Sequence, residues 1–176
     1  DALVQMLNQV DEPGFQRDVL DGMLAGLNGQ KNVQVPKEWP DTYSKLSKSK
    51  SADVRDRALK VALMFGDPSA IKRLKEIALN PDVELNARLS ALRNLVSRQT
   101  KGLAPLLHQL LKNTGLRKDA IIGLARYSDE RTPRGILANY AGWSREQQTA
   151  AINTLVSRRS YTLALLNAVG EGRIAS

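Results

Sequence analysis

The chain has one histidine, His108, and no cysteine among its 176 residues. A metal site needs several nitrogen, sulfur or carboxylate ligands, and a nucleophile needs an adjacent base. His108 lies in the leucine-rich stretch 102–112, where neither a second histidine nor a pair of carboxylates accompanies it. We therefore expect a partly exposed structural histidine, and we predict no catalytic residue, no metal ion and no cofactor for this segment.

Acidic residues occur close together at several places, and carboxyl pairs are common agents of general acid–base catalysis. That chemistry needs two carboxyl groups held in a cleft in unlike environments. Here the pairs fall at expected turns or helix starts, where negative charge complements the helix dipole and caps free backbone amides. Capping is therefore the favoured interpretation for all of them, namely Asp11/Glu12, Asp18/Asp21, Asp53/Asp56, Asp82/Glu84 and Asp129/Glu130.

Basic residues are the remaining candidates for a binding site. The net charge is +8: residues 1–44 carry three basic and seven acidic residues (−4), so residues 45–176 carry 23 and 11 (+12). Solvated helix surface is the favoured interpretation of this excess, and a positive groove for phosphates or an acidic partner is the alternative. The candidate partner-binding basic face consists of Lys72, Arg73, Lys75, Lys112, Arg131 and Arg134.

Apolar residues recur at three- and four-residue spacing almost throughout, which indicates helices rather than strands. Before residue 47 we expect two helices, over residues 2–10 and 15–27. An extended link over 28–40, which carries Trp39, and a short third helix over 41–46 should follow them. The apolar stripe of the first helix consists of Leu3, Met6, Leu7 and Val10. No apolar run approaches the ~18 residues of a membrane span, so no membrane insertion by this segment is expected.

After Ser51 the pattern repeats four times. Each repeat has an alanine with long aliphatic neighbours, a turn, and a second helix with its own apolar stripe, which in the last repeat is Leu163, Leu166 and Val169. The alanines, spaced 33, 29 and 31 residues apart, are Ala58, Ala91, Ala120 and Ala151. Because a single hairpin cannot bury both faces, stacked hairpins must share a core. We therefore predict an all-α fold, an α-solenoid in which the helical hairpins form a right-handed superhelix.

The first repeat resembles the short HEAT-like repeat. Its segments Val54-Arg55-x-x-Ala58-Leu59 and Gly66-Asp67-Pro68 place an arginine before the alanine and an aspartate in the turn. Arg88 and Arg117 stand at the same place in the next two repeats, whereas the fourth has Gln148 and the second turn lacks the aspartate. We expect these arginines to bind turn carbonyls and the turn aspartate. The expected organisation is an N-terminal hairpin with its link over residues 1–47 and about four HEAT-like repeats over 48–176, in one continuous domain cut from a larger protein.

A narrower resemblance covers nearly the whole chain. The segment from Asp18 to Leu27, the stretch Pro36–Trp39 and the closing Leu165–Gly172 are similar to the helical-repeat segment of large secreted or membrane-associated dehydrogenase-like proteins of planctomycetes. In that family a sugar-dehydrogenase-type β-propeller precedes the repeats and a c-type cytochrome domain follows them. The resemblance implies a spacer in a periplasmic or cell-envelope oxidoreductase. It transfers no catalytic or cofactor residue to any position here.

Three functions stay open on this basis. The favoured one is a non-catalytic scaffold or interaction module whose partners are another protein or neighbouring domains. The alternative is a sequence-independent nucleic-acid-binding or DNA-repair HEAT-like protein, which the scarcity of aromatic residues on the second helices disfavours. The third is an enzyme whose site forms only with neighbouring domains.

Overall fold

The computed structural model describes residues 2–30 and 33–174. Within these ranges the chain is all-α, with eleven α-helices, one 3₁₀ helix and no strand. This confirms the predicted all-α class. The chain forms two compact units, Asp1–Lys72 and Arg73–Ser176, and helix α5 (Pro68–Leu79) contributes residues to both. The predicted division after residue 47 stays a prediction.

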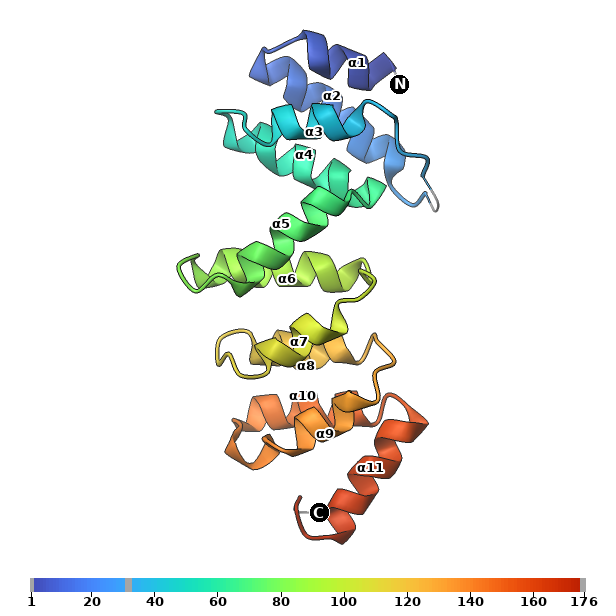
Figure 1. Ribbon diagram of the computed structural model, residues 1–176, viewed down its shortest axis with the longest axis vertical. Coiled ribbons are helices and arrows are strands. Elements are labelled where there is room, and N and C mark those ends of the chain that lie inside the picture. Colours follow the sequence, from blue (N-terminus) through green and yellow to red (C-terminus); the bar gives the residue numbers. More distant parts are fainter. Residues whose placement is uncertain (1, 31–32, 175–176) are drawn as a thin grey trace. The chain divides into compact units, whose positions relative to one another are not determined.

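The first unit contains α1 (Ala2–Gln9), α2 (Pro13–Leu27), α3 (Trp39–Leu46) and α4 (Ala52–Phe65). Helix α4 packs against α2 and α3, and α1 packs against the same two helices (Figure 1). Trp39 is fully buried here, with its ring 5.0 Å from that of Phe65 in an edge-on arrangement. The predicted extended link is therefore wrong at its end, because Trp39 is the first residue of α3 and Pro40 occupies an early helical position that proline tolerates.

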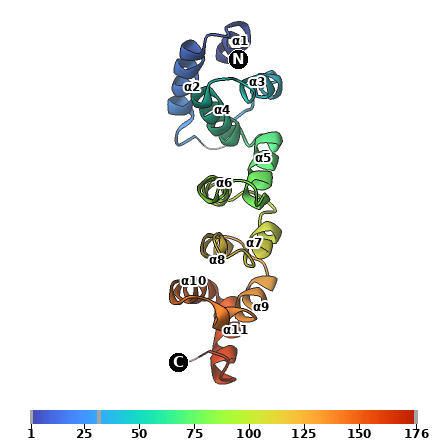
Figure 2. The same ribbon diagram turned by 90° about the vertical axis from the view of Figure 1, so that its left-hand side faces the viewer.

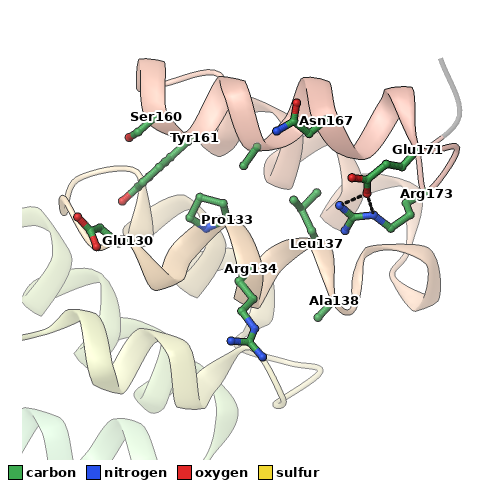
Figure 3. Close-up of a pocket in the computed structure, with 11 residues that line it drawn as sticks. Glu130, Pro133, Arg134, Leu137, Ala138, Ser160, Tyr161, Asn167, Glu171 and Arg173 are labelled. Atoms are coloured by element: carbon green, nitrogen blue, oxygen red, sulfur yellow. Dashed lines mark hydrogen bonds and ion pairs between the residues drawn. The ribbon is translucent and has the colours of Figure 1, made fainter.

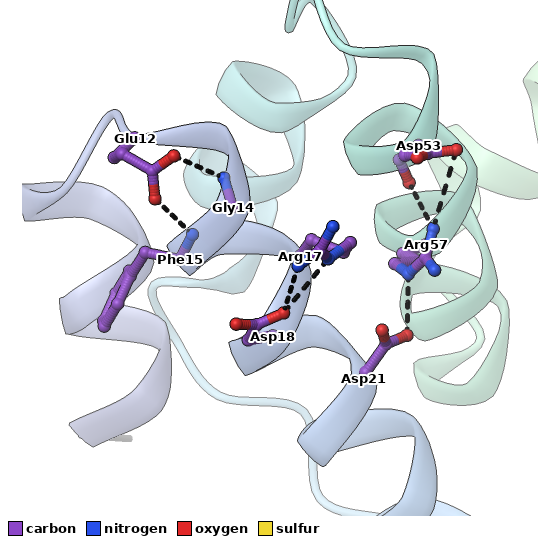
Figure 4. A network of polar contacts seen from close by, with 8 residues as sticks. All are labelled: Glu12, Gly14, Phe15, Arg17, Asp18, Asp21, Asp53 and Arg57. Atoms are coloured by element: carbon purple, nitrogen blue, oxygen red, sulfur yellow. Dashed lines mark hydrogen bonds and ion pairs between the residues drawn. The ribbon is translucent and has the colours of Figure 1, made fainter.

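Polar contacts join α2 to α4 (Figure 4). Glu12 caps α2 by accepting hydrogen bonds from the Gly14 and Phe15 amides, at 2.8 and 2.5 Å. These bonds lower the pKa of Glu12 and let α2 begin at Pro13, inside the break that the sequence predicted. Farther along α2, Asp21 accepts a 2.7 Å hydrogen bond from Nε of Arg57 on α4. The contact between α2 and α4 thus combines an apolar core with an ion pair.

The second unit contains α6 (Leu85–Ser97), α7 (Ala104–Leu110), α8 (Arg117–Leu124), α9 (Arg131–Leu137), the 3₁₀ helix η1 (Tyr140–Gly142), α10 (Arg145–Leu155) and α11 (Arg159–Gly170). Helices α6, α8 and α10 lie side by side in one row, and α7 and α9 lie on one side of it (Figure 2). Helix α8 contacts α6, α7 and α10, while α11 contacts α9 and α10. This unit is thus built from helices that pack against near neighbours in sequence.

The repeat alanines are buried, as the pattern predicts. Their exposed fractions are 0%, 3%, 0% and 0% for Ala58, Ala91, Ala120 and Ala151. Close helix approach goes further at Gly123 on α8, where an added Cβ would lie 3.0 Å from Val96 Cγ2 and 3.2 Å from Leu107 Cδ2. Small residues therefore set the spacing between helices at these contacts.

Two predicted apolar stripes are wrong. In α1 the buried residues are Val4 and Leu7, whereas Leu3 and Met6 are 46% and 42% exposed. In α11 the buried residues are Tyr161, Leu165 and Ala168, whereas Leu163 and Leu166 are 55% and 60% exposed. Both helices have more apolar residues than one buried face can use, so periodicity alone did not select the correct face.

Across residues 2–30 and 33–174, no helix has the length and apolar character that a bilayer crossing requires.

Candidate functional site

A groove of about 580 Å³ lies between α9 and α11 (Figure 3). We call it the α9–α11 groove. Its apolar walls come from both helices and consist of Pro133, Leu137, Tyr161 and Ala164. Polar side chains line its edges, with Glu130 and Ser160 at one end, the Glu171–Arg173 ion pair (2.6 Å) at the other, and Arg134 and Asn167 between them.

Tyr161 fixes the position of α11 beside α9. Its ring is 2% exposed, and its hydroxyl lies 2.8 Å from the amide nitrogen of Asp129, from which it accepts a hydrogen bond. The carbonyl oxygens of Tyr127 and Asp129 lie 3.0 and 2.9 Å from the same hydroxyl, which can donate to either of them. One side chain of α11 thereby binds the connector between α8 and α9, so the position of α11, which forms one wall of the groove, is fixed relative to this connector.

Next to this connector, Asp129 joins His108 and Arg131 in one charged cluster. Arg131 donates two hydrogen bonds to the Asp129 carboxylate, at 2.9 and 2.6 Å, and holds the pKa of Asp129 at about 2. His108 Nε2 lies 3.6 Å from Asp129 Oδ2. Burial lowers the pKa of His108, with the nearby Asp129 carboxylate opposing that effect.

This cluster lacks the geometry of a nucleophile–base–acid triad. In a triad the histidine contacts the nucleophile with one ring nitrogen and the carboxylate with the other. Here Nε2 of His108 faces both Asp129 and the hydroxyl of Thr132, at 3.6 and 3.5 Å, and Thr132 is fully buried. The cluster instead connects α7 to the start of α9. Farther along α9, the added Cβ of an alanine at Gly135 would lie 3.2 Å from His108 Nδ1.

Among the described residues, no group of three or more His, Cys, Asp or Glu side chains is placed to hold a metal ion. The capping interpretation of the acidic pairs is confirmed for Glu12 and for Asp129, whose carboxylate accepts from the Arg131 amide at 3.0 Å. It is wrong for Asp18 and Asp21, which lie inside α2 and pair with Arg17 and Arg57.

The six residues of the predicted basic face have different environments. Lys72, Arg73 and Lys75 lie on α5, but Lys72 belongs to the first unit and the other five residues to the second. Lys112 lies just after α7, which ends at Leu110. Arg131 forms an ion pair with Asp129, and Arg134 borders the α9–α11 groove.

The three arginines that precede the repeat alanines all bind backbone carbonyls, which lie in a turn, as predicted, for Arg55 and Arg117, but inside α5 for Arg88. Arg55 donates to the Ser49 and Lys50 carbonyls at 2.6 and 2.9 Å, Arg88 to Ala78 at 3.2 Å, and Arg117 to Leu111 at 2.7 Å. The predicted contact with the turn aspartate is wrong, because Asp67 accepts from the amides of Ser69 and Ala70 at the start of α5.

The fourth repeat uses a different side chain in the same way. Gln148, at the position of the missing arginine, donates through Nε2 to the Tyr140 carbonyl at 3.1 Å. An amide supplies a neutral hydrogen-bond donor where the other repeats supply a charged one. The position thus retains a side-chain donor to a carbonyl at or after the end of the preceding helix in all four repeats.

Sequence reasoning missed the α9–α11 groove and the partner of His108. Asp129 follows His108 by 21 residues, so only the packing of α7 beside the α8–α9 connector joins them. The one sign of this contact in the sequence was Asp129, which was predicted only to cap a helix.

No family model matches this chain, and a search of curated proteins finds no match either.

Proposed function

We propose that this chain is a non-catalytic α-solenoid of HEAT-like hairpins that binds a segment of a protein partner in the α9–α11 groove. The observation that carries the proposal is the groove itself, with its apolar walls, its polar edges and the anchored Tyr161. Concave sites with apolar walls and a few placed polar groups are the usual form of binding sites. The recurring hairpins, each with a side-chain donor to a carbonyl at or after the end of the preceding helix, support the solenoid assignment.

The charges at the groove favour a protein segment over a polyanion. Glu130 lies at one end, and at the other Glu171 compensates Arg173. The guanidinium of Arg134 points away from α11, so its aliphatic stem borders the groove (Figure 3). Nucleic acid would favour uniformly basic edges, because phosphate neutralisation supplies most of its binding free energy.

The resemblance to planctomycete dehydrogenase-like proteins suggests a setting for such a module. In that setting the repeats would separate a propeller from a cytochrome c domain, and the groove partner would be a neighbouring domain. The coding sequence around this segment tests the setting: a propeller upstream and a Cys-x-x-Cys-His motif downstream support it, and their absence contradicts it.

Groove binding is tested with peptides selected from a random phage-displayed library on the wild-type chain. The selected peptides are then titrated by fluorescence anisotropy against Ala164→Arg, which fills the groove, and Ala87→Arg, which adds the same side chain at an exposed site on α6. We expect Ala164→Arg to weaken binding by about tenfold or more, because the added side chain occupies the ligand's position, and Ala87→Arg to leave it unchanged. Failure to select any peptide, or equal binding to all three chains, would contradict the proposal.

Nucleic-acid binding remains the alternative for one specific reason. Arg73 and Lys112 are exposed and form no ion pair with any residue of the described ranges. Anisotropy titrations of labelled duplex and single-stranded DNA at ~50 and ~200 mM salt separate the two functions, since multi-phosphate binding weakens about 10³–10⁵-fold over that range. Sub-micromolar binding that survives the higher salt would favour the alternative over the protein-binding module.

A further inference from the structure

An exposed Asn-Gly pair, Asn28-Gly29, follows the last residue of α2. Asn28 is the C-cap of this helix, with φ −62° and ψ 128°, and Gly29 has a positive φ of 76°. These angles fit a type II turn, which the Gln30 amide closes by donating to the Leu27 carbonyl at 3.1 Å. Glycine suits the third position of this turn, because a positive φ costs it no steric energy.

Two groups that can react with each other are free at this turn. Among the described residues, neither the side-chain amide of Asn28 nor the backbone N–H of Gly29 forms a hydrogen bond. Beyond its chain neighbours, Gly29 has nothing within 4 Å of the place where a Cβ would stand, so no other side chain shields its nitrogen. This nitrogen can therefore approach the side-chain carbonyl carbon of Asn28 without first losing a hydrogen bond of its own.

Asn28 differs from the other nine asparagines of the chain. Each of those is followed by a residue with a side chain, which crowds the nitrogen that would attack. Asn94 and Asn153 also lie inside helices, where the next N–H is the donor of a helical hydrogen bond. Asn113 uses its side-chain carbonyl to accept a hydrogen bond from the Leu116 amide at 3.1 Å. Both the sequence and the structure thus single out Asn28.

We propose that Asn28 is a site of spontaneous deamidation, the reaction that makes asparagine a thermolabile residue. The Gly29 nitrogen attacks the side-chain carbonyl carbon of Asn28 and gives up its proton. The new C–N bond closes a five-membered succinimide ring, and the side-chain nitrogen leaves as ammonia. Solvent water then adds to either ring carbonyl and opens the ring to aspartate or isoaspartate, with no change of oxidation state. A neutral amide is thereby replaced by a carboxylate.

The turn opposes this reaction only weakly. At ψ 128° the Gly29 nitrogen lies away from the side chain of Asn28, so Asn28 must rotate about ψ before the attack. That rotation breaks two hydrogen bonds of Gln30, from its amide to Leu27 and from its side chain to the Gly26 carbonyl at 2.6 Å. Exposed bonds of this kind open at little cost in free energy, so the folded chain should react within about tenfold of the rate of the unfolded chain.

The product changes the end of α2. Asn28 stands beside the last carbonyls of this helix, which carry the partial negative charge of the helix dipole. A carboxylate at residue 28 is repelled by that charge, and the isoaspartate form also lengthens the backbone by one carbon atom. We therefore expect the deamidated chain, and Asn28→Asp as its stable equivalent, to unfold about 1–4 °C below the wild type.

Ageing of the whole chain at about pH 9 and ~37 °C, followed by trypsin digestion and mass spectrometry, tests the proposal, since the attacking nitrogen must lose its proton. Cleavage after Arg17 and Lys31 releases peptide 18–31, in which Asn28 is the single asparagine. We expect this peptide to gain the mass of an amide-to-carboxylate exchange before any other asparagine-containing peptide, and an isoaspartyl methyltransferase to label it. Asn28→Gln is the matched control: it keeps a side-chain amide, but its cyclisation requires a six-membered ring, so residue 28 should show neither change.

The same ageing in guanidinium chloride separates the effect of the fold from that of the sequence. We expect the rate at Asn28 in the folded chain to lie within about tenfold of the rate in the unfolded chain. A folded chain that reacts more slowly than this would show that the turn protects the site, and the proposal would be wrong. Earlier reaction of any other asparagine would overturn it as well. A melting temperature of Asn28→Asp equal to that of the wild type would contradict the effect assigned to α2.

Discussion

Replacing Arg117 by methionine should destabilise the second unit far more than removing a neighbouring surface charge. Arg117 Nε donates to the Leu111 carbonyl at 2.7 Å and its Nη1 donates to Gln147 Oε1 at 3.2 Å. The guanidinium also lies 5.6 Å from the ring centre of Trp143, which is 7% exposed. Methionine retains most of the aliphatic stem and removes all three interactions.

The magnitude follows from these contacts. A hydrogen bond from a charged donor contributes about 1.5–3 kcal/mol, and a cation–π contact about 0.5–1 kcal/mol at a partly exposed site. Because the two hydrogen bonds share one side chain, their contributions are not additive, and we expect Arg117→Met to cost about 2–4 kcal/mol. Lys118→Met is the matched control: it removes the same charge from the next residue, whose partner Glu146 is 71% exposed, and surface pairs contribute about 0–1 kcal/mol.

The assay is urea unfolding followed by far-UV circular dichroism and by Trp143 fluorescence, with Trp39→Phe in every chain so that the fluorescence reports on the second unit. We expect the Arg117→Met midpoint to fall well below that of Lys118→Met at an unchanged slope. Arg117→Lys should lie between them, because an ammonium group lacks the planar fork that reaches two acceptors. Free energies of unfolding for Arg117→Met and Lys118→Met that agree within about 0.5 kcal/mol would refute the structural role assigned to Arg117.

Three further predictions concern packing and pH. Gly123→Val should lower the free energy of unfolding by about 1–3 kcal/mol, because the added side chain overpacks against Val96 and Leu107. Gly22→Ala, on the open face of α2, should raise it by about 0.5–1 kcal/mol. Thermal unfolding of both variants measures this contrast. Arg131 depresses the pKa of Asp129 to about 2, so the ion pair stabilises the fold above pH ~4. That contribution is lost as the pH falls through about 2. Arg131→Met should therefore weaken the decline of the unfolding free energy at acid pH. Burial lowers the pKa of His108, so the free energy of unfolding should fall as the pH drops below about 6.5. Melting temperatures measured from about pH 8 to 5 should show this fall in the wild type and not in His108→Gln.

The sequence was sufficient for the features that depend on local spacing. Helical periodicity predicted the all-α class, the alanine spacing predicted which small residues are buried, and the recurring arginine predicted a bond to a connector carbonyl. The same logic failed for α1 and α11, because each carries two apolar stripes and only packing selects one of them. It also failed for the groove, whose walls Leu137 and Ala164 meet only through the packing of α11 on α9.

The positive charge of the chain has a structural explanation that does not require a polyanionic ligand. Three arginines of the second unit donate to carbonyls at or beside helix C-termini: Arg88 to Ala78 of α5, Arg117 to Leu111 after α7, and Arg158 to Ala125 after α8. These carbonyls carry the partial negative charge of the helix dipole, which a count of acidic residues omits.

A repeat built in this way accumulates arginines without matching carboxylates. With Arg55, whose acceptors Ser49 and Lys50 follow α3, the arginines that bind a carbonyl at or beside the end of a preceding helix number four of the 23 basic residues in 45–176. If all four are set aside, the excess in that region falls from +12 to +8. Gln148, which binds the Tyr140 carbonyl without a charge, indicates that what this position requires is a donor and that the charge is its by-product. Net charge therefore overstates the number of cations that this protein can offer to a partner.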